Sequence, residues 1–258
     1  MLPCFAEHGS RGDSCPNPHL PPRGGHQRRA VNPLVSVIIP VHNGAEFIET
    51  ALESVFAQAH RPLEVVVADD ASTDATAALV ESFPEVIQLL KLSRCGVSAA
   101  RNAAVAASNG EWLAFLDADD LWLPDKLHVQ LQAAGEHPDA AVFLGGKRIR
   151  VEDSARDWYT GPAHGEQLVS YEPSVWLVRR DAFERVGQFD TARTIGEDTD
   201  WIVRAKDAGL RVHVCPEVLC ERRIHGRNAT RAPYDLKGIT LGILRDSVRR
   251  KTEARGQP

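Results

Sequence analysis

The feature that most constrains the fold is a regular alternation of short apolar segments with helical patterns in the first half of the sequence. The apolar segments are rich in branched residues and cover 34–40, 63–68, 86–92 and 111–116. Helical stripes lie between them at 47–56, 73–83 and 97–108. Short links between alternating strands and helices favour parallel pairing, because each connecting helix crosses a face of the sheet. We therefore predict an α/β fold with three layers, α/β/α, around a mainly parallel, doubly wound sheet.

The second half of the sequence is less regular, and no internal repeat is visible. Pro124 suits the first turn of a helix that follows the fourth strand. Further elements are expected as strands at 140–149, 173–179 and 211–220, helices at 181–186, 199–208 and 235–250, and a loop over 150–170. The pattern predicts one folded domain over 32–230, with halves at 32–120 and 121–230.

The two ends of the chain differ in composition from the section between them. Residues 1–31 are rich in Pro, Gly and Arg without a periodic apolar pattern, so we expect a disordered tail there. Residues 231–258 are expected to form a basic helix and tail. Both ends are basic while the whole chain has a formal charge of −5, so the middle section is strongly acidic. Such a body is unsuited to nucleic acid and suggests a metal ion instead.

Apolar runs and cysteines bear on where the protein acts. No run of about 18 apolar residues is present, so no transmembrane segment is expected. The N-terminal region lacks the apolar core of a secretory signal. The five cysteines contain no C-x-x-C pair, which supports neither a disulfide framework nor a zinc site. We expect a cytoplasmic protein, with peripheral association at a membrane as the alternative.

Polar residues stand where three of the predicted strands end. His42 and Asn43 follow the first strand, Asp70 closes the second, and the acidic run 117–120 follows the fourth. Each group alone is explained by turn formation or helix capping. Three carboxylates within four residues repel one another, however, and a divalent cation would offset that repulsion. Hard oxygen ligands favour Mg²⁺ or Mn²⁺, which commonly bridge one or two carboxylates to substrate phosphates.

Several common catalytic motifs are absent from the sequence. No Gly-x-Gly-x-x-Gly follows the first strand, and no phosphate-loop motif occurs, so dinucleotide binding and P-loop chemistry lose their support. No His-Glu-x-x-His or Gly-x-Ser-x-Gly is found either. What remains is a second acidic stretch at 196–201, ahead of a predicted helix, and a basic loop at 222–226 that contains His225 and could hold a phosphate leaving group. A helix-dipole role for the acids and a merely exposed histidine are the plainer alternatives.

Taken together, these segments resemble the family 2 glycosyltransferases, inverting enzymes of the GT-A fold. The resemblance covers about residues 34–230 and rests on seven motifs in order. They are VSVIIPVHNG (35–44), VADDASTD (67–74), GVSAARN (96–102), FLDADD (115–120), GQFD (187–190), GED (196–198) and RIH (223–225). The Gln-x-x-Arg-Trp motif of processive relatives is absent, which indicates transfer of a single sugar.

For the nucleotide-sugar, the resemblance implies a site in the half at 32–120. The residues it assigns to that donor are Pro40, His42, Asn43, Asp70, Gly96, Arg101, Asp117 and His225. Asp70 resembles the aspartate that pairs with the edge of the base, and the segment around Gly96 and Arg101 resembles one that closes over the nucleotide. His42 departs from the small polar or aromatic residue usual before Asn43, which puts base or ribose packing in doubt.

For the chemistry, the resemblance implies a D-x-D motif and a catalytic base. Asp117 and Asp119 match D-x-D, and Asp119, together with His225, would bind Mn²⁺ or Mg²⁺. Asp198 matches the catalytic base. Glu197 and Trp201, with the loop at 187–190, would border the acceptor in the half at 121–230.

The resemblance thus implies metal-assisted transfer of one sugar, with inversion, from a nucleotide-diphospho-sugar to an acceptor hydroxyl. A UDP- or dTDP-sugar is the preferred donor, because Asp70 can accept a hydrogen bond from the ring N–H, although guanine has such a donor too. The acceptor is a glycan, a lipid-linked sugar or a small molecule. Two alternatives remain open: a sugar-phosphate nucleotidyltransferase and a non-catalytic nucleotide-sugar-binding protein.

Overall fold

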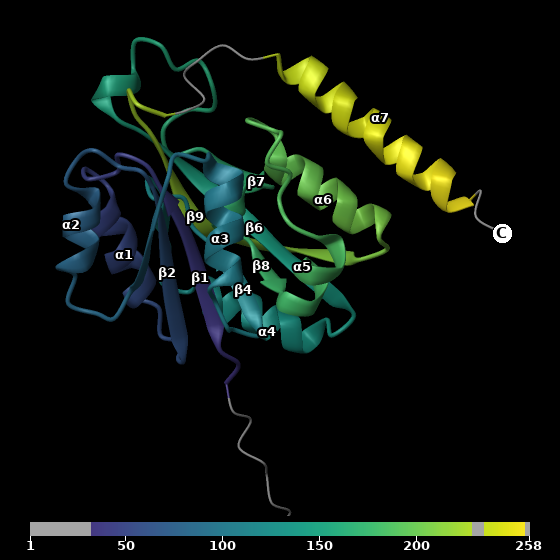
Figure 1. Cartoon of the computed structure of the whole chain (residues 1–258), viewed down its shortest axis with the longest axis horizontal. Helices are drawn as coiled ribbons and strands as arrows, with labels where there is room; N and C mark the ends of the chain where they lie inside the picture. Colours follow the sequence, from purple (N-terminus) through teal and green to yellow (C-terminus); the bar gives the residue numbers. More distant parts are fainter. Residues whose placement is uncertain (1–31, 229–234, 256–258) are drawn as a thin grey trace, which may run out of the picture. The chain divides into compact units, whose positions relative to one another are not determined.

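The computed structural model describes residues 32–228 and 235–255, so the tail expected at 1–31 lies outside the described residues. Within them, nine strands form one mixed sheet in the order β3-β2-β1-β4-β8-β6-β9-β5, with β7 paired to β6 (Figure 1). The strands are β1 (Val35–Val41), β2 (Leu63–Asp70), β3 (Gln88–Leu92), β4 (Trp112–Phe115), β5 (Leu121–Trp122), β6 (Ala140–Val151), β7 (Gln167–Ser170), β8 (Leu177–Arg179) and β9 (Arg211–Ile224).

The predicted parallel pairing holds in the half of the sheet built from the first four apolar segments. β1 lies between β2 and β4 and pairs in parallel with both, and β3 pairs in parallel with β2. The other half is mixed, because β8 runs antiparallel to its neighbours β4 and β6, whereas β6 and β9 are parallel. The chain order reverses at β1, and in α/β sheets such a point opens a crevice at the carboxyl ends of the strands.

Helices cover both faces of the sheet, as the alternating pattern predicted. They are α1 (Ile48–Phe56), α2 (Thr76–Glu81), α3 (Val97–Ala106), α4 (Lys126–Glu136), α5 (Arg180–Val186), α6 (Glu197–Asp207) and α7 (Leu236–Arg255), with 3₁₀ turns at Asp153–Ala155 and Pro173–Val175. One apolar cluster joins α1, α2 and α4 to Val37 and Ile39 of β1, and the other joins α3, α5 and α6 to Ile38. Strands buried on both faces read as continuous apolar runs, which explains the sequence pattern.

Three expectations about local structure need correction. Pro124 precedes α4 instead of lying in its first turn, because residues 121–122 form strand β5 against β9 and the Leu123 N–H is bonded to the Leu219 carbonyl. The loop expected at 150–170 contains a 3₁₀ turn and β7. The strand expected at 173–179 is divided into a 3₁₀ turn and the short β8. The interruption places Ser174 beside the acidic run that follows β4.

Helix α7 occupies the segment where a basic helix was expected and lies alongside α6 (Figure 1). Ile243 is buried in this contact, and Arg250 and Lys251 both pair with Asp207 of α6. Among the described residues, no helix combines the length and the apolar character needed to cross a membrane.

Candidate active site

The turn after β1 and the end of β2 hold each other in place. The ring Nδ1 of His42 lies 2.8 Å from the backbone oxygen of Asp70. Asn43 has a positive φ of 53°, a conformation that asparagine tolerates better than most residues. Its backbone N–H donates to Ser72 Oγ, and its side-chain oxygen accepts from Thr73 N–H, each at 2.8 Å. His42 is exposed and Asn43 half-buried at this edge, whereas Pro40 is buried within β1.

Asp70 organises the segment that leads into α3. Its carboxylate accepts the backbone N–H groups of Cys95 and Gly96 at 2.6 and 3.0 Å and pairs with Arg94 at 2.6 Å. Burial alone would raise the pKa of Asp70, but the hydrogen bonds from Cys95 and Gly96 and the charge of Arg94 outweigh it and lower the pKa. Gly96 has a φ of 88°, which favours glycine at this turn. The fold therefore brings Asp70 and Gly96 together.

The acidic run after β4 contacts the basic loop that follows β9. Asp119 Oδ2 lies 3.1 Å from His225 Nε2 and accepts the side-chain N–H of Asn228 at 3.0 Å. His225 is buried, whereas the Asp119 side chain is 32% exposed. Burial would raise the pKa of Asp119, but the hydrogen bond and charge of His225 lower it, so this carboxyl is ionised. Asn228 was missed from sequence, although it lies only three residues beyond His225.

The neighbouring Asp120 is enclosed by the protein and bonded to two other segments of the chain. It is buried, accepts the hydroxyl of Ser174 at 2.7 Å and the backbone N–H of Arg223 at 3.2 Å. Burial, reinforced by the negative charges of Asp119 and Asp117, raises the pKa of Asp120 to about 7. Asp120 therefore fixes the loop from within, while the side chain of Asp119 is partly exposed to solvent.

A buried cation joins the acidic run to the start of α6. Arg101, on α3, donates to Asp117 Oδ1 at 2.6 Å and to Glu197 Oε1 at 2.7 Å, and its side chain is only 4% exposed. The two carboxylates outweigh the effect of burial and raise the pKa of Arg101. Sequence reasoning assigned Arg101 and Asp117 to the donor and Glu197 to the acceptor, but it did not foresee that one guanidinium links them.

Helix α6 begins at Glu197, so the second acidic stretch forms its first turn instead of preceding it. Gly196 caps the helix with a left-handed φ of 82°. Burial raises the pKa of Asp198 above its usual range, although the Thr199 N–H and Arg101 oppose this effect. Burial also raises the pKa of Glu197. Asp198 Oδ1 accepts from Thr199, whereas within residues 32–228 and 235–255 no donor contacts its Oδ2.

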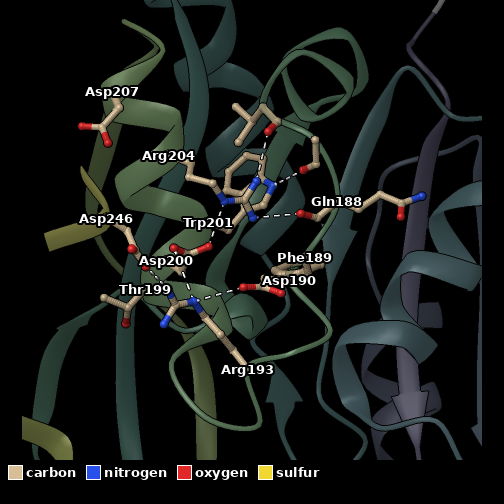
Figure 2. Close-up of polar contacts among 12 residues, drawn as sticks. Gln188, Phe189, Asp190, Arg193, Thr199, Asp200, Trp201, Arg204, Asp207 and Asp246 are labelled. Carbon is tan, nitrogen blue, oxygen red and sulfur yellow. Dashed lines mark hydrogen bonds and ion pairs between the residues drawn. The ribbon is translucent and has the colours of Figure 1, made fainter. Parts of the chain in front are cut away.

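The loop before α6 is held by two arginines (Figure 2). Arg204 donates to the backbone oxygens of Val186 and Gln188 and pairs with Asp200 at 2.8 Å. Arg193 lies within 4 Å of the carboxylates of Asp190, Asp200 and Asp246, the last of which is on α7. This network fixes the loop 187–193 and the start of α6 as a unit.

The structure contradicts the expectation that Trp201 borders the acceptor. Its side chain is 0% exposed, packs between Trp176 and Phe183, and donates its indole N–H to the Gly187 oxygen at 2.8 Å. A residue enclosed in this way cannot touch a substrate. Trp201 therefore anchors α6 in the core.

Two cations meet at Glu172: Arg222, which belongs to the basic loop predicted at 222–226, and Lys147, which was given no role from sequence. Lys147 of β6 and Arg222 of β9 both pair with Glu172, the first at 2.6 Å. Burial and the charge of Arg222 lower the pKa of Lys147 to about 8, against the attraction of Asp120 and Asp198. Lys147 is remote in sequence from the basic loop, and the pairing of β6 with β9 brings the two segments together.

The donor atoms of Asp119 and His225 fit a divalent cation that also binds substrate oxygens. Within the described part of the chain, no group of three or more His, Cys, Asp or Glu side chains is preassembled for a metal. Asp119 and His225 nevertheless offer an ionised carboxylate and an imidazole nitrogen that face each other near solvent. Mg²⁺ and Mn²⁺ sites commonly use one or two protein ligands and complete their shell with phosphates and water.

Known proteins share both the sequence pattern and the fold. Residues 36–197 match the family described as "Glycosyl transferase family 2". A teichuronic acid biosynthesis glycosyltransferase of Bacillus subtilis, TuaG, is 31% identical over 84% of this chain and 89% of its own length. The succinoglycan biosynthesis protein ExoO of Rhizobium meliloti is 35% identical over 71% of this chain and 59% of its own.

Two solved structures are similar in fold. Residues 1–349 of S. aureus TarS in complex with UDP-GlcNAc have a TM-score of 0.66 and 20% identity, covering 84% of this chain and 66% of that solved chain. The mannosyltransferase PcManGT from Pyrobaculum calidifontis, in complex with GDP-Man and Mn²⁺, has a TM-score of 0.58 and 28% identity, covering 77% of this chain and 59% of its own. The chain thus spans about two thirds or less of these two solved proteins and of ExoO.

The fold and these similarities define a glycosyltransferase of GT-A type. The chain belongs to glycosyl transferase family 2. The fold class and the enzyme class expected from sequence are both confirmed, and membership in this family supports sugar transfer from a nucleotide-sugar.

Proposed function

We propose that the protein transfers one sugar from a nucleotide-diphospho-sugar to an acceptor hydroxyl, with inversion and with the help of Mn²⁺ or Mg²⁺. One observation carries the proposal. The buried Arg101 joins the acidic run of the donor side, through Asp117, to the first turn of α6, through Glu197. This link holds Asp198 in a fixed relation to the donor loop, as a single in-line displacement requires.

On the donor side, Asp119 and His225 would hold the cation. When bound, the cation neutralises charge that develops on the departing diphosphate. The chain itself prepares this position, because Asn228 and the buried imidazole orient Asp119 before any ligand arrives. The complex of PcManGT with Mn²⁺ supports a divalent cation for this fold.

On the acceptor side, Asp198 would remove the proton from the attacking hydroxyl. A carboxylate with a raised pKa is a stronger base, and Asp198 has its Oδ2 available. Glu197 is less suited, because Arg101 holds one of its oxygens at 2.7 Å and stabilises its negative charge. The geometry therefore favours Asp198 as the base and Glu197 as the residue that positions it.

The base of the nucleotide would lie between the β1 turn and the segment at 94–96. Asp70 accepts hydrogen bonds there from Arg94, Cys95 and Gly96, and of these only Arg94 has a largely exposed side chain that a ring N–H could replace. We propose UDP- or dTDP-sugars as donors. TarS is described with UDP-GlcNAc and PcManGT with GDP-Man, so competition between UDP, dTDP and GDP in a binding assay tests this preference.

Replacing Asp198 tests the proposed base. Asp198→Asn keeps the shape of the side chain but cannot accept the proton, and general-base catalysis is typically worth about 10²–10⁴ in rate. We expect transfer to fall at least about a hundredfold, while donor affinity measured by calorimetry stays within about threefold. Glu197→Gln is the matched control and should lose less activity. Full loss in Glu197→Gln with an active Asp198→Asn would place the base one residue earlier.

Product analysis separates the proposal from the two alternatives. A glycosyltransferase releases a nucleoside diphosphate from the nucleotide-sugar, whereas a sugar-phosphate nucleotidyltransferase exchanges pyrophosphate. A non-catalytic binding protein releases neither. Family membership favours the first outcome. The acceptor, which we propose to be a glycan, a lipid-linked sugar or a small molecule, would be found by supplying each class with the same donor.

A further inference from the structure

Helix α7 has an inner face that is fixed to the body of the protein. Ile243 is buried, Ser247 and Arg250 bond to Asp207 of α6, and Asp246 pairs with Arg193 at 2.6 Å (Figure 2). Ile239 lies against Gly196, where even a methyl group would meet its side chain at 2.7 Å. These contacts fix the rotation of α7 about its axis, and they therefore determine which residues face away from α6.

The opposite face of α7 combines exposed aliphatic side chains with basic ones. Leu241, Leu244 and Val248 are 61%, 51% and 64% exposed. Their spacing of three and four residues places them on one stripe of the helix. Three basic residues, Lys237, Arg245 and Arg249, lie on or beside this stripe and are exposed as well. We call the three aliphatic residues with these three basic residues the outer face of α7.

We propose that the outer face of α7 docks onto the surface of a lipid bilayer that contains anionic headgroups. An apolar stripe bordered by Lys and Arg is the composition of helices that lie in a membrane interface. The aliphatic side chains would enter the boundary between headgroups and acyl chains, while the flanking cations contact lipid phosphates. A second copy of this face is a poor occupant, because its basic borders would repel one another.

Docking through this face would place the bilayer beside the helix that carries Asp198. The inner face of α7 contacts Gly196, two residues before Asp198, and Arg193 ties the preceding loop to the same helix. The protein would then act on acceptors at a membrane surface. The docking inference does not depend on the proposed chemistry, since lipid binding is measured without any sugar donor.

Vesicle sedimentation tests this docking surface in the full chain. We expect the protein to bind vesicles of mixed phosphatidylcholine and phosphatidylglycerol, to bind phosphatidylcholine alone much more weakly, and to detach as salt increases. The triple variant Leu241→Ser, Leu244→Ser and Val248→Ser should bind at least roughly tenfold more weakly, and so should Lys237→Gln with Arg245→Gln.

Val86→Ser is the matched control, because Val86 is 95% exposed but lies between α2 and β3. It should bind like the unaltered protein. Circular dichroism and thermal unfolding, unchanged in all variants, would show that the fold is kept. The proposal is overturned if the triple variant binds anionic vesicles as well as the unaltered protein, or if the unaltered protein does not bind them. Sedimentation as a dimer that the triple variant abolishes would instead assign the face to self-association.

Discussion

Removing the positive charge of Arg101 tests the link between the two sides of the site. In Arg101→Gln, Asp117 and Glu197 lose their shared partner, and Glu197 is left as a nearly enclosed carboxylate, 11% exposed. Removing one partner of a buried ion pair typically destabilises a protein by about 3–5 kcal/mol. A change of this size lowers Tm by roughly 6–20 °C in a domain of this length.

The free energy of unfolding that Arg101→Gln loses should increase with pH. Burial raises the pKa of Glu197, and Arg101 opposes that rise, so the variant has a still higher pKa in the folded state. A group whose pKa is raised by folding loses its stabilising contribution as pH increases through the folded value. Arg101→Gln should therefore be destabilised more at pH 8 than at pH 5.

Urea unfolding at the two pH values measures this difference directly. Adding Glu197→Gln to Arg101→Gln removes the isolated carboxylate, so the double variant should regain part of the lost free energy of unfolding and lose most of the added pH dependence. If Arg101→Gln lowered the free energy of unfolding by less than about 1 kcal/mol, and equally at both pH values, the reasoning would be refuted. The link would then contribute no more than an exposed pair.

Two further predictions concern a buried lysine and the donor-side carboxylate. Lys126 is fully buried, with Nζ 2.8 Å from Gln130 Oε1, and burial lowers the pKa of Lys126 to about 7. Above that pH the unfolded chain binds a proton at Lys126 that the folded chain does not, so the free energy of unfolding should rise with pH. In chemical denaturation between pH 6.5 and 9, we expect this rise to be on the order of 2 kcal/mol larger than in Lys126→Met. A difference in free energy of unfolding between the two proteins that does not change with pH would contradict this. Asp119→Asn should weaken donor binding at least about tenfold in Mn²⁺ and change it little in EDTA, as measured by calorimetry, because the substitution removes one metal ligand. Equal affinity of both proteins in Mn²⁺ would instead make Asp119 a structural partner of His225.

The sequence was informative where local patterns decide the structure. The alternation of apolar runs and helical stripes predicted the strands around β1, because each run is buried on both faces. It also placed His42, Asp70 and the run at 117–120 at the ends of three strands, and His42 and Asp70 are in contact in the structure. The mixed half of the sheet was less predictable, since pairing of β8 with β4 depends on contacts between distant segments.

Tertiary contacts decided the residues that sequence reasoning assigned wrongly or missed. Trp201 follows an acidic motif and was expected to border the acceptor, yet the aromatic rings of Trp176 and Phe183 enclose it. Lys147 was given no role from sequence, and it meets Arg222 of the basic loop at Glu172 because β6 and β9 pair. The bridge from Asp117 through Arg101 to Glu197 spans three segments, so no local spacing could reveal it.

The configuration of the transferred sugar tests the central proposal most directly. The donor sugar would be incubated with Mn²⁺ and acceptor, the nucleotide product identified by chromatography, and the anomeric configuration of the product read by NMR. A single displacement with Asp198 as base gives a nucleoside diphosphate and a product of opposite anomeric configuration to the donor. A product that retains the donor configuration would contradict the one-step mechanism proposed for this site.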